Sequence, residues 1–345
     1  MSEAEKPARR VRYGGTHPRK FGEKYKEQNP GRYAGEVAKV LASGKTPAGM
    51  HRPIMLREVL EILAPQPGEI VVDATLGYGG HARELLAAVQ PGGRLIGLDV
   101  DSLELPKTEA RLRALGFPEE TLSVQCTNFA GLAGVLSTRA PGGAHAILAD
   151  LGVSSMQLDD PARGFTFKHH GPLDLRMNPE RGQPASALLA AVSEKDLART
   201  LTEFSDEPLA GPLAYALVQA CAQAPIITTT QLATIVRTAL PAEAPEPESV
   251  VRRVFQALRI AVNDELATLD ALLRHLPACL APGGRVAILT FHSGEDRRVK
   301  HAFKDGLTEG RFSEISREIL RPSPEELRAN PRASSAKLRW AKRAA

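Results

Sequence analysis

The chain lacks long apolar runs and has few cysteines, and each shortage excludes a class of protein. Only 3 of its 345 residues are cysteine, and their wide spacing fits neither a disulfide framework nor a metal cluster. We expect Cys126, Cys221 and Cys279 to be reduced core residues of a cytoplasmic protein. No apolar run reaches the length of a membrane span, and we expect no export signal because the N-terminus lacks an apolar core. The sequence therefore predicts no membrane partner and no metal.

Acidic residues are scarce at both ends of the chain. Residues 1–52 hold 12 Lys+Arg against 5 Asp+Glu, and residues 328–345 hold 6 Lys+Arg and no acid. Since the whole chain carries +4, the middle carries −9. Two basic ends on an acidic body favour a polyanionic partner, although solubility tails have the same composition. Residues 1–50 read as a basic arm whose single aromatics could stack on bases.

Short apolar runs alternate with helical stretches in the rest of the chain. Pro-Gly-Gly precedes three of these runs, at 91–93, 141–143 and 282–284, and Pro and Gly end helices. Strands that alternate with helices predict a parallel sheet, so the fold class is α/β and Rossmann-like. The predicted strands are 69–73, 94–99, 121–125, 145–150 and 285–291.

The fourth and fifth predicted strands are too far apart for one crossover connection. Helical patterns fill the gap, and we predict helices over 194–204, 207–223 and 228–239, then a linker at 241–248. A long helix follows, with leucines from Leu266 to Leu280 on one face. The predicted domains are the α/β parts 51–157 and 251–345, the latter ending in a basic tail, and an inserted helical domain at 158–250.

A glycine-rich loop follows the first predicted strand, which ends at Asp73. Glycines in such a loop let a ligand approach the backbone closely, and the helix that follows favours a polar or anionic group at its start. Asp99 ends the next strand and can accept hydrogen bonds from ribose hydroxyls. The loop alone does not separate NAD from S-adenosylmethionine (SAM). Asp73, suited to a methionine amino group, and Asp150, at the end of the fourth strand, favour SAM. The glycines of the loop are Gly77, Gly79 and Gly80.

Several sequence strings resemble one known family. The longest is Asp-Leu-Gly-Val-Ser-Ser-Met-Gln-Leu-Asp-Asp at 150–160, and others lie at 51–60, 73–81, 163–167, 171–177, 255–263, 280–295 and 330–339. With these strings the chain resembles the bacterial 16S rRNA cytosine-N4 methyltransferases, the MraW or RsmH family. The resemblance implies a class I SAM-dependent methyltransferase fold, an inserted substrate-recognition domain, SAM as cofactor and small-subunit rRNA as partner. It implies that the residues that bind SAM are Gly79, Gly80, His81, Asp99, Phe129, Asp150 and Gln157.

The chain departs from the family pattern in three places. The family does not generally carry a basic arm like residues 1–50. Gly294 stands where relatives usually have leucine, and Ser-Asp-Glu-Pro at 205–208 replaces a Gly-Glu-Glu turn. These departures suggest a paralogue with a shifted target. The alternatives are therefore a methyltransferase for another RNA or DNA target, and a non-catalytic SAM-binding factor of ribosome assembly.

Methyl transfer to a cytosine amine sets the expected chemistry. The enzyme must align donor and acceptor, and the amine is a weak nucleophile because its lone pair delocalises into the ring. We predict that Asp150 accepts hydrogen bonds from this amine, or else only holds SAM. His292 and Ser293 are predicted catalytic residues that line the base pocket, with a purely structural histidine as the alternative.

Two groups of side chains are predicted to bind the RNA. One is a cluster of arginines, acids and aromatics that could stack on an extruded base, or else be an ion-paired loop that fixes the inserted domain. The other is a polar stripe on one helix, opposite the leucines and facing a cleft between domains. The chain is also predicted to form a homodimer. The cluster comprises Arg163, Phe165, Phe167, Asp174 and Arg176, and the stripe comprises Gln256, Arg259 and Asn263.

Overall fold

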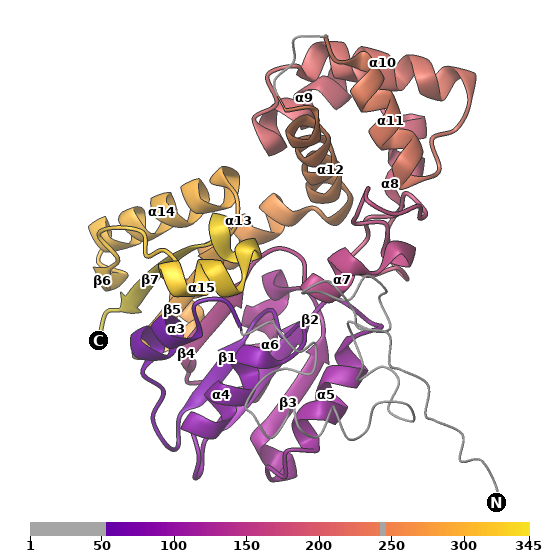
Figure 1. The fold of residues 1–345 in the computed structure, drawn as a ribbon. Coiled ribbons are helices and arrows are strands. Elements are labelled where there is room, and N and C mark those ends of the chain that lie inside the picture. Colours follow the sequence, from indigo (N-terminus) through magenta and orange to yellow (C-terminus); the bar gives the residue numbers. More distant parts are fainter. Residues whose placement is uncertain (1–52, 242–245) are drawn as a thin grey trace, which may run out of the picture. The chain divides into compact units, whose positions relative to one another are not determined.

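Seven strands form one sheet in the order β3-β2-β1-β4-β5-β7-β6 (Figure 1). The computed structural model describes residues 53–241 and 246–345, so the predicted basic arm lies outside the described residues. Strand β7 alone runs antiparallel to its neighbours. This arrangement is that of Rossmann-like class I SAM-dependent methyltransferases, which confirms the predicted fold class. The strands are β1 (Ile70–Asp73), β2 (Arg94–Asp99), β3 (Leu122–Cys126), β4 (Ala144–Asp150), β5 (Leu280–Thr290), β6 (Phe312–Ile315) and β7 (Lys337–Arg343).

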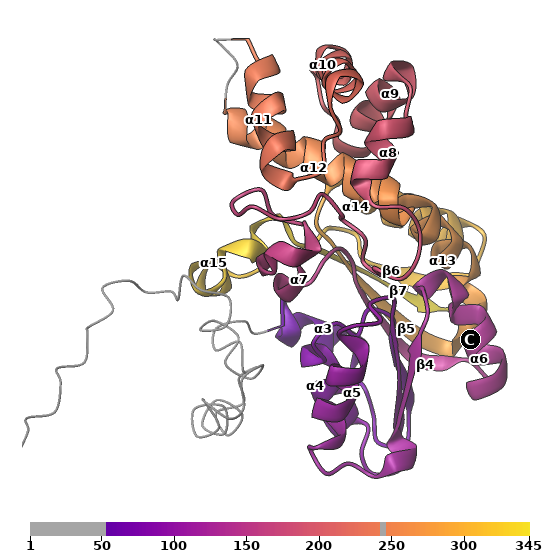
Figure 2. The same ribbon diagram turned by 90° about the vertical axis from the view of Figure 1, so that its right-hand side faces the viewer.

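Helices cover both faces of the sheet (Figure 2). Successive strand residues point to opposite faces, so Leu95 of β2 packs with one helix layer and Ile96 with the other. Buried apolar side chains on both faces match the near-continuous apolar runs expected of parallel strands. One layer contains α3 (Leu56–Leu63), α4 (Gly80–Ala88) and α5 (Leu105–Arg113), and the other contains α6 (Leu132–Arg139), α13 (Glu265–Cys279) and α14 (Ser293–Thr308).

The segment between β4 and β5 is helical and buries a core of its own. Residues from five of its helices, Leu189, Leu197, Leu213, Leu232 and Val254 among them, form one apolar cluster. This segment leaves the sheet after β4 through the short helix α7 (Ser155–Asp159). The five helices are α8 (Ala185–Ala191), α9 (Glu194–Ser205), α10 (Ala210–Gln223), α11 (Thr229–Ala239) and α12 (Pro247–Asn263).

The C-terminal part of the chain differs from the prediction. Residues 337–343, expected within a basic tail, form β7 inside the sheet, with Leu338 and Ala341 fully buried. Lys337 and Arg339 pair with Asp296 of α14, so these cations neutralise an acid of the same chain. Strands β6 and β7, helix α8 and the short helix α15 (Pro324–Ala329) were all missed by the sequence analysis.

Two predicted boundaries were also wrong. Strand β5 begins at Leu280, before the Pro-Gly-Gly at 282–284, which produces a register shift within the strand instead of preceding it. The expected long helix is two helices, because Asp264 has a left-handed φ of +51° and interrupts the helix there. The leucines from Leu266 to Leu276 therefore lie on α13 and Leu280 begins β5, whereas the predicted polar stripe lies on α12. Cys126 is exposed and not a core residue.

Two further findings concern the described residues only. No helix in that part of the chain combines the length and apolarity needed to cross a bilayer. Within the same residues, no three His, Cys, Asp or Glu side chains gather in a way that could hold a metal ion.

Candidate functional site

The glycine loop joins β1 to α4 and is tied to the end of β2. Gly77 and Gly79 have φ values of +49° and +84°, a left-handed conformation that favours glycine. Gly77 N donates a hydrogen bond of 2.6 Å to Asp99 Oδ2, and Thr108 Oγ1 donates one of 2.6 Å to Gly77 O. Gly80, the first residue of α4, is packed so closely that an added Cβ would lie 2.6 Å from Pro53 Cγ. These contacts hold the loop in one conformation.

Three carboxylates end three adjacent parallel strands, as the sequence predicted. Asp99 ends β2, Asp73 ends β1 and Asp150 ends β4. Burial, reinforced by neighbouring acids, raises the pKa of Asp73 to about 7 and that of Asp150 to about 8, and burial also raises the pKa of Asp99. A cationic ligand stabilises the ionised carboxylates, so this edge fits the ammonium and sulfonium groups of SAM.

Asp150 has one oxygen with no partner within the described part of the chain. Its Oδ1 is buried and accepts no hydrogen bond there, although its backbone N–H donates to Thr75 Oγ1 over 2.6 Å. An unsatisfied buried acceptor costs about 1–3 kcal/mol. Such a cost at the carboxyl end of a central strand is typical of a binding or catalytic group.

His81 contacts the second oxygen of Asp150 from the first turn of α4. Its Nε2 lies 3.0 Å from Ile54 O. Because a carbonyl only accepts hydrogen bonds, Nε2 carries the ring proton and Nδ1 presents a lone pair. That Nδ1 lies 3.7 Å from Asp150 Oδ2. Burial lowers the pKa of His81 to about 4, so this contact joins a neutral ring to the carboxyl group and is not an ion pair near neutral pH.

His292 and Ser293 begin α14 just after β5. His292 is its N-cap: Nδ1 accepts a hydrogen bond from Glu295 N over 3.4 Å, and Nε2 lies 3.2 Å from Glu295 Oε1. This geometry agrees with the structural alternative for His292. Ser293 Oγ donates to Asp206 Oδ2 over 2.8 Å and so connects α14 to the end of α9.

Glu295 is a buried acid that the sequence analysis missed. Burial favours its neutral form, yet the contact of its carboxylate with His292, the Phe291 N–H and the positive charge of Arg259 keep the pKa of Glu295 below its ordinary value. Its negative charge contributes to the raised pKa of Asp150. The signal was available, since a glutamate three residues after an N-cap is typical of a capping box.

The predicted RNA-binding cluster is mostly engaged within the chain. Arg163 pairs with buried Asp101 over 2.8 Å, and Arg176 pairs with Asp174 over 2.8 Å. Phe165 is buried in the helical core, and the Phe167 ring centroid lies 5.2 Å from that of Phe255. This arrangement matches the alternative of an ion-paired loop that fixes the helical segment.

The three polar residues of α12 also bond to other parts of the chain. Gln256 Nε2 donates to Phe204 O over 3.0 Å, and Arg259 pairs with Glu265 over 2.8 Å. Asn263 Nδ2 donates to Leu175 O over 2.7 Å. Each residue therefore holds α12 against a neighbouring element, and Arg259 in addition acts on Glu295.

The last two predicted SAM-binding residues follow β3 and β4. Phe129 opens a 3-10 turn, Phe129–Gly131, directly after β3, and it is half-buried against the core. Gln157 lies on α7, and its Nε2 donates to Asp101 Oδ2 over 2.7 Å. Both side chains lie near the carboxyl edge of the sheet, and their contact with the cofactor stays a prediction.

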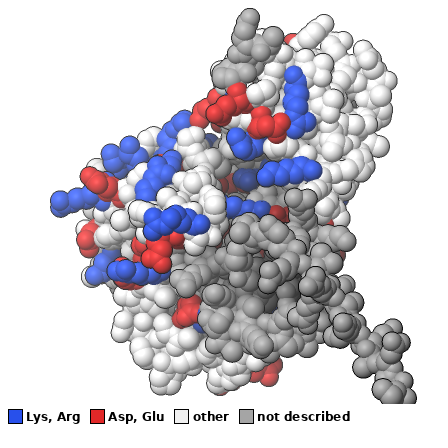
Figure 3. Space-filling model, viewed as in Figure 1, with Lys and Arg blue, Asp and Glu red and all other residues white. Residues whose placement is uncertain are grey.

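Lys and Arg side chains gather over the C-terminal helices on the face drawn in Figure 3. Helix α14 carries exposed Arg297, Lys300 and Lys304, and α15 carries exposed Arg328. Exposed Arg252 lies on α12. Exposed cations of this kind are suited to contact a phosphate backbone.

Comparison with known proteins gives one family. The sequence profile of the MraW methylase family matches residues 48–344. The chain is 50% identical over 343 residues to "Ribosomal RNA small subunit methyltransferase H 2" of Alkaliphilus metalliredigens, with 98% of each chain covered. It is 42% identical to "Ribosomal RNA small subunit methyltransferase H" of Anaeromyxobacter sp., covering 84% of this chain and 96% of that one. A solved rRNA methylase from Streptococcus thermophilus has a TM-score of only 0.39 at 13% identity, covering 84% of this chain and 94% of that one.

These coverages bear on the basic arm. An alignment over 98% of the chain includes most of residues 1–50, whereas one over 84% leaves out a stretch about as long as that segment. Relatives such as the Alkaliphilus protein therefore share the segment. The expectation that the family does not generally carry it holds only for the shorter relatives.

Proposed function

The chain belongs to the MraW methylase family, and from this membership we propose that it methylates the exocyclic N4 amine of a cytidine in small-subunit (16S) ribosomal RNA. It is a SAM-dependent methyltransferase, as its family and fold establish. Relatives that are 46–50% identical over nearly the whole chain are named as methyltransferases of small-subunit ribosomal RNA.

The cofactor side of the site fits SAM. The first turn of α4, which begins at Gly80 directly after the loop, has backbone N–H groups suited to a polar ligand group. Asp99 at the end of β2 is placed to accept from ribose hydroxyls. Asp73, whose pKa burial raises to about 7, is stabilised in its ionised form by a nearby ammonium group. When bound, SAM supplies an electrophilic methyl group on a sulfonium.

The environment of Asp150 is the observation that supports a cytosine amine as the acceptor. Asp150 Oδ1 is buried and has no partner among the described residues, and it can accept one N–H of the cytosine amine. This hydrogen bond draws the amine lone pair out of conjugation and holds N4 for attack. As the N4–CH3 bond forms and the S–CH3 bond breaks, N4 must lose a proton.

Asp150 is also suited to receive that proton. Its carboxyl group has a pKa of about 8, and the lone pair of His81 Nδ1 lies 3.7 Å from Oδ2. A protonated Asp150 can turn toward this lone pair and donate to it. His81 thus stabilises the form that Asp150 reaches after transfer, and solvent takes the proton afterwards.

Transfer of labelled methyl groups in vitro tests the proposal. We expect incorporation into small ribosomal subunits or their RNA, recovered as N4-methylcytidine, and a loss of about 100-fold or more for Asp150→Asn. Glu61→Gln, which removes only an exposed ion pair on α3, is the matched control and should retain full activity. Incorporation into another base, or into large-subunit RNA alone, contradicts the proposal.

A second candidate is the same chemistry on a different nucleotide. One contact supports it: Asp206 accepts from Ser293 over 2.8 Å and lies 3.8 Å from Arg297, so two departures from the family pattern, Asp206 and Gly294, meet at one place. Mapping the labelled nucleotide on the subunit RNA separates the two candidates. A label at a site other than that methylated by the shorter relatives favours the second.

Two further proposals concern location and assembly. A ribosomal substrate implies the cytoplasm, which fractionation of a tagged strain tests. The homodimer stays a prediction, and sedimentation should give the mass of two chains. A mass of one chain at micromolar concentration contradicts it.

A further inference from the structure

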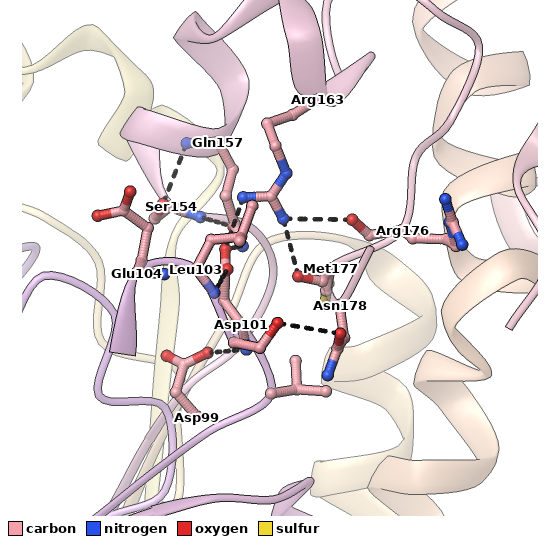
Figure 4. Close-up of polar contacts among 12 residues, drawn as sticks. Asp99, Asp101, Leu103, Glu104, Ser154, Gln157, Arg163, Arg176, Met177 and Asn178 are labelled. Carbon is pink, nitrogen blue, oxygen red and sulfur yellow. Dashed lines mark hydrogen bonds and ion pairs between the residues drawn. The ribbon is translucent and has the colours of Figure 1, made fainter. Parts of the chain in front are cut away.

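Asp101 connects the cofactor side of the site to the start of the helical segment (Figure 4). Its backbone N–H donates to Asp99 Oδ1 over 2.9 Å. Its side chain is 3% exposed, and Oδ2 accepts from Gln157 Nε2 over 2.7 Å and from Arg163 Nη1 over 2.8 Å. One residue thus contacts the predicted ribose carboxylate, α7 and the 3-10 turn Pro161–Arg163.

Arg163 carries the connection onward. Its Nη2 donates to Met177 O over 2.8 Å and to Arg176 O over 3.3 Å. Residues 175–178 are held from other sides as well: Asn263 Oδ1 accepts from Met177 N over 2.7 Å, and Ser102 Oγ donates to Asn178 Oδ1 over 3.2 Å. The segment is therefore clamped between the loop after β2 and the end of α12.

The clamped segment has an unfavourable backbone conformation. Leu175 has a φ of +64° although it is not glycine, and its side chain is buried. Such a residue costs about 1–3 kcal/mol and persists only where surrounding contacts hold it. The contacts of Arg163 and Asn263 supply that restraint. Without them, we expect residues 175–178 to relax to another conformation.

A buried ion pair is weak evidence for stability, because desolvation offsets the attraction between the charges. Its geometry points to a different role. Arg163 needs its planar fork to reach Asp101 with one nitrogen and two carbonyls with the other. The pair fixes direction and distance between two segments that are remote in the sequence.

We propose that Asp101 and Arg163 are a pair of positioning residues, which hold residues 175–178 and the helices that follow in register with the Asp99 end of the cofactor site. They touch neither the methyl group nor the acceptor. The inference rests on the proposed function, because a segment in register matters only if the helical segment presents the RNA. A misplacement of 1 Å costs about 100-fold in rate.

The variant Asp101→Asn tests this with little change of shape. The backbone N–H to Asp99 remains, and the amide oxygen can still accept from Leu103 N and Glu104 N. The amide NH2, however, faces the donors of Gln157 and Arg163. We expect the Kd for SAM, measured by calorimetry, to rise by no more than about tenfold, because Gln157 also loses its partner, while kcat/KM for small subunits falls by about 100-fold.

A double-mutant cycle separates positioning from a general loss of stability. Arg163→Lys should lower kcat/KM like Asp101→Asn, and the double variant should be no worse than either single variant. The matched control is Arg285→Lys. Arg285 pairs with Glu69 over 2.8 Å and donates to Leu63 O over 2.8 Å, at the opposite end of the strands. It should lower Tm and leave kcat/KM within about twofold.

The outcomes distinguish this inference from the proposed function. If the wild-type protein methylates no ribosomal RNA, the proposed function fails. If it does, the inference is overturned by Asp101→Asn or Arg163→Lys variants that keep full kcat/KM, by losses that are additive in the double variant, or by a weakening of SAM binding that accounts for the whole loss.

Discussion

His81 Nδ1 lies 3.7 Å from Asp150 Oδ2, with its lone pair toward the carboxyl group because Nε2 donates to Ile54 O. Burial, together with the nearby acids Asp73 and Glu295, raises the pKa of Asp150 to about 8, so the protonated carboxyl group is favoured near neutral pH in the free protein and can donate to His81 Nδ1. Binding of the cationic cofactor must therefore shift Asp150 toward its ionised form. The first two predictions follow from this coupling.

The affinity for SAM should rise with pH. In the free protein, the pKa values of Asp73 and Asp150 are about 7 and about 8. Because SAM is cationic it favours both ionised forms, so its binding near pH 7 releases protons. We expect the Kd to fall as pH rises from 6 to 8.5, by at most about tenfold per unit for each proton released. Calorimetry in two buffers of different ionisation enthalpy measures the release, and a Kd independent of pH contradicts the prediction.

The stability of the ligand-free protein should carry the opposite signature at Asp150. A carboxyl group whose pKa is raised on folding binds more protons in the folded state, so its ionisation destabilises the fold as pH rises from about 4 to about 8. Other acids, such as Asp296 with a lowered pKa, act in the reverse direction, and the comparison must therefore use a variant. Asp150→Asn should be more stable than the wild type at pH 8 and no more stable at pH 4. A constant difference in the free energy of unfolding across this range contradicts the assignment.

The contact between Asp206 and Ser293 should affect the RNA side of the reaction alone. Both side chains are exposed, so their hydrogen bond adds little to stability. Asp206→Gly, which removes the side chain and suits the φ of +50° at this position, should leave Tm nearly unchanged. We expect the KM for small subunits to rise about fivefold, the equivalent of about 1 kcal/mol, with the Kd for SAM unchanged. Glu248→Ala, which removes another exposed pair, is the control. A fall in SAM affinity contradicts the prediction, because it shows that the contact affects cofactor binding.

We expect Gly294 to be needed for methylation of this chain's own target nucleotide. A Cβ at this position would lie 3.2 Å from His292 Nδ1, so leucine forces the imidazole or the start of α14 to move. Gly294→Leu, which restores the residue usual in the family, should lower kcat on the chain's own target by about tenfold or change the nucleotide that is labelled. Unchanged kinetics and an unchanged nucleotide show that the substitution is neutral.

Removal of residues 1–50 tests the role of the basic ends. Residues 1–52 hold 12 Lys+Arg, and each lost phosphate contact should reduce the slope of log affinity against log salt by about 0.7–0.9. We expect the truncated protein to bind small subunits more weakly and with a shallower salt dependence. Equal affinity at every salt concentration identifies the segment as a solubility aid.

Much of the fold was predictable because local sequence patterns determine it. The five parallel strands are apolar runs that end at turn residues, and three of them end in the carboxylates Asp73, Asp99 and Asp150. Strand β7 escaped because charged residues alternate with its buried ones, such as Leu338 and Ala341. Only the pairing with β5 and β6 reveals it as a strand.

The site was predictable only where the position of a residue within its own strand or loop indicates its role. Asp101 was missed because its partner Arg163 lies 62 residues away in the sequence. No local sequence pattern indicates such a pairing. The predicted RNA contacts of Arg163 and Asn263 illustrate the same limit. Their residue types suit RNA, yet in the structure both bond to the backbone of residues 175–177.

The central claim is that this chain methylates a cytidine amine of small-subunit RNA and that Asp150 is essential to it. Mass spectrometry of ribosomal nucleosides from a deletion strain, complemented with wild type or Asp150→Asn, tests it most directly. The account predicts that N4-methylated cytidine at one position disappears on deletion, returns with the wild type and stays absent with Asp150→Asn. Methylcytidine that is unchanged by the deletion, or fully restored by Asp150→Asn, contradicts it.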